Sequence, residues 1–97
     1  MDQETLSLKS SVERASEPLS AEVDGETIIF SLEQGNYYGL GELGSRIWSL
    51  IEKPVLVNDL VDELLQAFDV QREACCDDTL EFLEQLRTNR LINVIDP

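Results

Sequence analysis

The hydrophobic pattern of the chain changes its period once, close to Gly41. Before Gly41, three short segments are rich in β-branched, aromatic or alternating apolar residues, which suit half-buried strands. These segments are residues 19–23, 27–32 and 37–40. Asp24-Gly25 and Gly35-Asn36 separate them, and such pairs tolerate the positive φ angles of tight turns. The first half of the chain therefore predicts a meander of antiparallel strands.

After Gly41 the apolar positions follow a helical spacing. Leu43, Ile47, Leu50 and Ile51 fall on one face of a first helix, which Lys53-Pro54 ends because the residue before proline avoids the α region. Asn58 is a suitable N-cap for a second helix, whose apolar face is Leu60, Val61, Leu64, Leu65 and Phe68.

A third helix is expected over residues 72–88, with acidic residues crowding its first half and Arg87 near its end. Asn89 is a plausible left-handed stop for this helix. The apolar tail Leu91–Ile95 is expected to return to the sheet or the helices.

Strands followed by three helices predict an α+β domain, and three short helices beside a small three-stranded antiparallel sheet describe a winged helix-turn-helix. Residues 1–18 read as a partly ordered N-terminal segment before a domain at 19–97. Within that segment Leu6 and Leu8 alternate with polar residues, which suits a short edge strand, and residues 10–18 read mostly as a loop.

Composition excludes several classes of function. The 97 residues carry 20 acidic against 7 basic side chains, a net charge of −13 that repels phosphate backbones and argues against nucleic-acid binding. No apolar run is long enough to cross a membrane, and the acidic first residues are unlike a signal peptide, so we expect a cytoplasmic protein. The acids between Arg14 and Arg46 suit either simple solubility or attraction of a basic partner segment.

Catalytic and metal-binding residues are scarce. The chain has no His, which removes the commonest general base and metal ligand. Cys75 and Cys76 are adjacent, and without a second Cys or His cluster they make a poor zinc site. We expect one of them to be a small core residue and the other to be half exposed, and we expect no enzymatic activity, metal or cofactor.

Six motifs follow one another in a specific order along residues 12–95. They are the hairpin from Asp24-Gly25 to Tyr37-Tyr38-Gly39-Leu40, then Gly44-Ser45-Arg46-Ile47-Trp48, Val57-Asn58-Asp59-Leu60, Phe68-Asp69-Val70, Phe82-Leu83-Glu84-Gln85-Leu86 and Leu91-Ile92. This ordered set resembles the PqqD-like family, small domains that recognise the precursors of ribosomally made, modified peptides. Gly41, where similar members often have Asn, and Asn89-Arg90, where they often have Gly, depart from the pattern.

The resemblance implies that the leader part of a precursor lies between the third strand and the third helix. A short aromatic last strand beside a helix is also suited to β-augmentation, in which an extended peptide adds a strand. By position, the accepting strand comprises Tyr37, Tyr38, Gly39 and Leu40, and the helix wall comprises Cys75, Asp78, Thr79, Phe82 and Leu86. Gly39 is expected to let a foreign backbone approach; which strand face is core stays open.

The function implied is a non-catalytic protein that binds a leader peptide and presents it to other enzymes. The chain is most similar to the free-standing form of lasso-peptide pathways, whose partners are a separate leader peptidase and a downstream cyclase. One alternative is a precursor chaperone for a radical enzyme in another modified-peptide or cofactor pathway. An alternative of another class is an acidic winged-helix adaptor that docks folded proteins.

Overall fold

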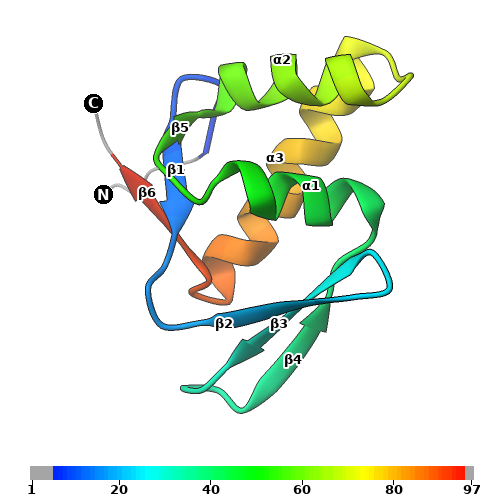
Figure 1. The fold of residues 1–97 in the computed structure, drawn as a ribbon. Helices are drawn as coiled ribbons and strands as arrows, with labels where there is room; N and C mark the ends of the chain where they lie inside the picture. Colours follow the sequence, from blue (N-terminus) through cyan, green and yellow to red (C-terminus); the bar gives the residue numbers. More distant parts are fainter. Residues whose placement is uncertain (1–5, 96–97) are drawn as a thin grey trace.

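The computed structural model describes residues 6–95, and these form two small antiparallel sheets and three helices (Figure 1). The α+β class predicted from the sequence is therefore confirmed. In chain order the elements are β1 (Ser11–Arg14), β2 (Leu19–Val23), β3 (Glu26–Ser31), β4 (Asn36–Gly39), α1 (Glu42–Leu50), β5 (Val55–Leu56), α2 (Val57–Ala67), α3 (Arg72–Thr88) and β6 (Ile92–Ile95).

The predicted meander is the sheet β2-β3-β4, in which β3 is central. Its turns use three of the four expected residues: Asp24 and Gly25 have φ angles of 54° and 83°, and Gly35 has 72°. Asn36, also expected in a turn, is the first residue of β4. Leu19 pairs with Phe30, and Ile29 pairs with Tyr38. Within the described residues, β4 is hydrogen-bonded to β3 alone, so its other edge is open.

A second sheet, in the order β5-β1-β6, was missed by the sequence analysis. The strand of the N-terminal segment is Ser11–Arg14, so the expected strand at Leu6 and Leu8 and the loop over residues 10–18 were wrong. β1 is central in this sheet and pairs with β5 and β6, which are far away in sequence. Of its four residues Val12 is the buried one, which leaves too short an alternation to see in the sequence.

α2 begins two residues earlier than expected, at Val57, and its N-cap is Leu56 and not Asn58. No side chain caps this helix end. Instead the N–H groups of Val57 and Asn58 donate to the carbonyls of Ser10 (2.8 Å) and Leu8 (3.0 Å). Because the N-terminal segment satisfies these first-turn donors, a side-chain cap is not required.

α3 has the predicted bounds, and its end is a Schellman motif. The N–H of Leu91 bonds the carbonyl of Leu86 at 2.9 Å, and the N–H of Arg90 bonds that of Arg87 at 3.0 Å. The positive φ, 62°, is at Arg90, whereas Asn89 has a φ of −90°. The left-handed stop is therefore one residue later than predicted.

The core lies where the three helices meet the inner sides of both sheets. The fully buried large side chains come from every layer: Val12, Ile29, Ile47, Ile51, Val57, Leu60, Val61, Leu64, Leu83 and Leu91. Arg14 packs its guanidinium carbon 4.8 Å from the centre of the Trp48 ring and donates from Nε to the Trp48 carbonyl at 2.9 Å. None of the described helices is both long and apolar enough to cross a membrane.

The burial of Val12 in β1 leads to a prediction about the stability of the fold. Val12→Ala should lower the free energy of unfolding by about 2 kcal/mol, because it removes two buried carbon groups and leaves a cavity. Val23→Ala is the matched control: Val23 is 54% exposed on β2, so its truncation should cost less than about 0.5 kcal/mol. Urea denaturation measures both values. Equal losses in the two variants would show that β1 is not part of the core.

Candidate functional site

The open edge of β4 presents two residues to a partner. Leu40 donates its N–H to the carbonyl of Thr27, the residue opposite it, at 2.9 Å. Hydrogen-bonded and non-bonded pairs alternate along an antiparallel ladder. In the observed register Tyr38 therefore also faces β3, whereas the N–H and C=O groups of Tyr37 and Gly39 point to the open edge.

The two faces of β4 differ sharply. Leu40 is buried and Tyr38 is half-buried on the inner face, whereas Tyr37 is 73% exposed and Gly39 is exposed on the outer face. This answers the question that the sequence left open. It also corrects the role expected of Gly39: a Cβ there would meet only Ile28 Cδ1, at 3.6 Å, so it would lie on the sheet face and not in the path of an approaching strand.

The outer face of this sheet is unusually apolar for a solvent-facing surface. The rings of Phe30 and Tyr37 pack against each other in a tilted arrangement, with their centres 4.8 Å apart and an angle of 46° between their planes. A shallow hollow of about 240 Å³ on this face is lined by Leu19, Ser20, Ala21, Val23, Ile28, Phe30 and Tyr37. A strand added to β4 would extend this surface beyond Tyr37.

α3 faces the inner side of β4 through Phe82. A Cβ placed on Gly44 would lie 3.0 Å from Phe82 Cζ and 3.3 Å from Leu40 Cβ, so the ring, the glycine and the leucine meet at one point. Phe82 is half-buried and Asp78 is exposed, which leaves both side chains accessible. Gly44, the contact surface for this ring, was not singled out as a site residue from the sequence.

Three of the residues predicted for the helix wall lie deeper than expected. Cys75, Thr79 and Leu86 are all buried, and Cys75 Sγ is 3.9 Å from Thr79 Oγ1 within the core. Their side chains form the support behind the wall and not its surface. Periodicity alone cannot separate these layers, because core and groove faces of one helix carry the same apolar spacing.

A polar contact, also unexpected from the sequence, joins the β3–β4 turn to the end of α3. Gln34 donates from Nε2 to the carbonyl of Asn89 at 2.6 Å, and its Oε1 accepts the Tyr38 hydroxyl at 2.7 Å. The same hydroxyl is 3.3 Å from Asn89 Oδ1. In the sequence, Gln34 was recognisable only as part of a predicted turn, and Asn89 only as the predicted end of the third helix.

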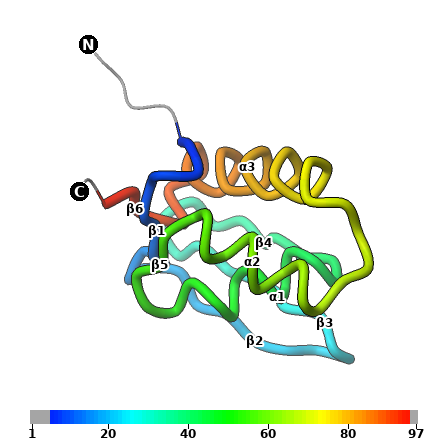
Figure 2. Tube along the Cα trace, turned by 90° about the horizontal axis from the view of Figure 1, so that it is seen from above, coloured from blue at the N-terminus to red at the C-terminus, as the bar shows by residue number. Residues whose placement is uncertain are grey.

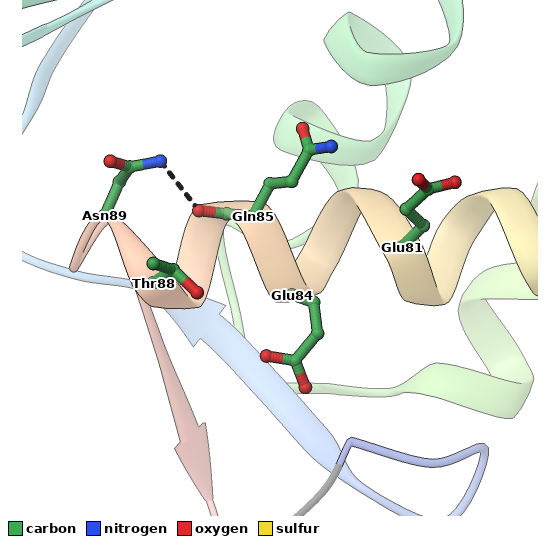
Figure 3. A pocket seen from close by; sticks show the side chains of 5 residues that line it. All are labelled: Glu81, Glu84, Gln85, Thr88 and Asn89. Carbon is green, nitrogen blue, oxygen red and sulfur yellow. Dashed lines mark hydrogen bonds between the residues drawn. The ribbon is translucent and has the colours of Figure 1, made fainter.

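A second hollow, of about 410 Å³, lies on the last turns of α3 next to this contact. Glu81, Glu84, Gln85, Thr88 and Asn89 line it. Figure 3 shows Asn89 Nδ2 donating to the Gln85 carbonyl, a bond of 2.9 Å, so the hollow and the polar contact share Asn89.

Metal-ligand clusters and cysteines were examined in the sequence as candidate chemistry, and the structure addresses both. Residues 6–95 contain no group of three or more acidic or cysteine side chains arranged to hold a metal ion. Cys75 is buried, Cys76 is half exposed and both are free thiols, as predicted. At the start of α3, Arg72 is paired with Asp62 of α2, and the hydrogen bond to that carboxylate raises the pKa of the guanidinium.

Comparison with known proteins gives two matches. The family model of coenzyme PQQ synthesis protein D (PqqD) matches residues 26–92. A solved structure of TbiB1 in complex with the TbiA(beta) leader peptide superimposes with a TM-score of 0.79 at 30% sequence identity, covering 88% of this chain and 99% of that one. No curated protein matches the chain.

The two cysteines should differ in reactivity. Iodoacetamide should alkylate the native protein once, at Cys76, because Cys75 is only 2% exposed. Intact mass spectrometry followed by peptide mapping measures the sites. A Cys76→Ser variant should stay unlabelled until denaturant is added. Rapid labelling of Cys75 in that folded variant would contradict its place in the core.

Proposed function

The chain belongs to the PqqD family, and we propose that it binds the leader region of a ribosomally made precursor peptide by pairing the leader, as an added strand, with β4. The observation that carries the proposal is the open β4 edge, where Tyr37 and Gly39 direct unpaired backbone groups outward. The likeness to TbiB1, whose structure contains a leader peptide, supports it.

The register of β4 determines how a leader would lie. In an antiparallel pair, residues directly opposite each other place their side chains on the same face. The leader residues opposite Tyr37 and Gly39 would therefore extend the apolar outer face. The residue between them would point to the inner side, beside Tyr38 and Phe82. Backbone bonds give affinity in this mode, and the pocket for the inward side chain gives selectivity.

The remaining predicted residues take two roles in this proposal. Asp78 and Phe82 contact the leader from α3, and Leu40, Cys75, Thr79 and Leu86 hold that wall in place from the core. The exposed acids between Arg14 and Arg46 favour a leader with basic residues flanking its apolar ones.

In this proposal the protein acts by binding the leader and catalyses no reaction on it. The protein presents the leader to enzymes that act on the rest of the precursor; in a lasso-peptide pathway these are a separate leader peptidase and then a cyclase. All of this takes place in the cytoplasm, where the precursor is made. The chain itself neither cleaves nor modifies the peptide, because it lacks the groups that such reactions require.

The direct test is a titration by fluorescence polarisation. Two fluorescein-labelled probes are used: the TbiA(beta) leader peptide and the leader region of any small precursor encoded beside this chain. A scrambled peptide of the same composition is the control. Saturable binding of a leader, at least tenfold tighter than its scrambled form, supports the proposal. Equal binding of leader and scrambled peptides for every probe would refute it.

Backbone pairing can be separated from side-chain contact at Gly39. Gly39→Pro removes the outward N–H and should reduce leader affinity more than tenfold. Gly39→Ala keeps that N–H, and its added Cβ makes only ordinary contact with Ile28, so affinity should stay within about threefold. Circular dichroism confirms that both variants fold. A folded Gly39→Pro variant that binds like the unaltered protein would place the leader elsewhere.

The pocket contact is tested at Phe82. Phe82→Ala should weaken leader binding by about 1–3 kcal/mol, because it empties the wall opposite Tyr38. Phe68→Ala, at the end of α2, is the control: this ring is also half-buried, and it lines a hollow with residues of α1 and of the β2–β3 turn, none of which belongs to β4. Its loss should lower stability without changing affinity. Equal affinities for the two folded variants would exclude Phe82 from the site.

A further inference from the structure

The β3–β4 hairpin is tied to α3 at two separate places. At one, Phe82 of α3 and Leu40, just after the end of β4, both pack against Gly44 of α1. At the other, Asn89 bonds Gln34 and lies within hydrogen-bond distance of Tyr38. Asn89, the C-cap of α3, follows Phe82 by seven positions, an axial rise of about 10 Å. β4 therefore runs antiparallel to α3, with one contact to the helix near each end of the strand. Figure 2 shows β2 on the side of the sheet away from α3.

Further hydrogen bonds hold both Asn89 and the turn that contains Gln34 in place. The Schellman motif sets the backbone of Asn89, and its Nδ2 bonds the Gln85 carbonyl at 2.9 Å. On the other side, Gln34 donates its own N–H to Ser31 Oγ at 3.2 Å, which holds the turn. Gln34 then bonds both Asn89 and Tyr38, so a residue of the turn joins a residue of the strand to the helix.

We propose that Gln34, Tyr38 and Asn89 form a clasp that fixes the separation of β4 and α3, with Gln34 and Asn89 acting as positioning residues for the leader. This rests on the proposed function, since the two elements are the walls of the proposed site. Without the clasp, β4 keeps its register with β3, but the hairpin loses its polar tie to the helix, so its bonds to β3 open more often. A strand edge that is held at a fixed distance from α3 loses less conformational entropy when it binds a peptide than a mobile edge does.

The clasp also limits the leader residue that fits. The inward-pointing side chain enters between Phe82 at one contact and the Tyr38 hydroxyl at the other. Because both contacts are fixed, this space cannot widen to admit a larger group without breaking the bonds of Gln34. The site should therefore discriminate by side-chain volume at this one leader position, and loosening the clasp should relax that discrimination.

Gln34→Ala and Tyr38→Phe test the clasp, because one removes its centre and the other removes only the hydroxyl. Gln66→Ala is the matched control, an equal truncation at an exposed residue of α2. Amide exchange is measured by NMR on the free protein. In both clasp variants the amides of Asn36 and Tyr38 should exchange about threefold to tenfold faster, the effect of losing one or two hydrogen bonds. The amides of Leu64 and Leu83 should not change.

Stopped-flow binding of the fluorescein-labelled TbiA(beta) leader gives the second readout. The association rate should fall by a similar factor in the clasp variants and stay constant in Gln66→Ala. Unchanged exchange at Asn36 and Tyr38 would overturn the clasp, and so would faster exchange that extends equally to Leu64 and Leu83. If the unaltered protein binds no leader, the proposed function fails on that result, while the exchange data still decide whether the clasp exists.

Discussion

The register between β3 and β4 is the constraint on which the site depends. The bond from the Leu40 N–H to the Thr27 carbonyl fixes which backbone groups of β4 are used inside the sheet and which are open. A slip of one residue would exchange the two sets and would also move Tyr38 to the outer face, away from α3. Gly35, at a φ of 72°, gives the β3–β4 turn a left-handed position that suits this register and that glycine adopts more easily than other residues.

The sequence predicted those parts of the fold that are local. The meander and α3 could be read from period, turn residues and charge, because each lies within one continuous segment. β1 could not, since its place between β5 and β6 depends on pairing with residues about 40 and 80 positions away, and only Val12 of its four residues is buried. Asn58 was misread as a cap for the same reason: the carbonyls that satisfy the start of α2 come from the distant N-terminal segment.

The candidate site was predictable at the level of elements and less so at the level of residues. A short aromatic strand and an apolar helix are visible in the sequence, and the structure brings Leu40, just after the strand, and Phe82 of the helix together at Gly44. Burial then divides the predicted helix residues into exposed ones and supporting ones. Asn89, where the family pattern often has Gly, places its Oδ1 3.3 Å from the Tyr38 hydroxyl. This departure from the pattern adds a side-chain contact to the hairpin that glycine cannot supply, whereas the backbone carbonyl that accepts from Gln34 would be present with either residue.

Amide exchange of Tyr37 and Gly39 on addition of a leader tests the central claim most directly. In the free protein their N–H groups point to the open edge, and a paired strand would bond both of them. The account predicts that saturating leader slows exchange at Tyr37 and Gly39 at least tenfold, whereas the amides of Tyr38 and Leu40, already bonded to β3, change much less. A bound leader that leaves Tyr37 and Gly39 exchanging as in the free protein would contradict strand addition at β4.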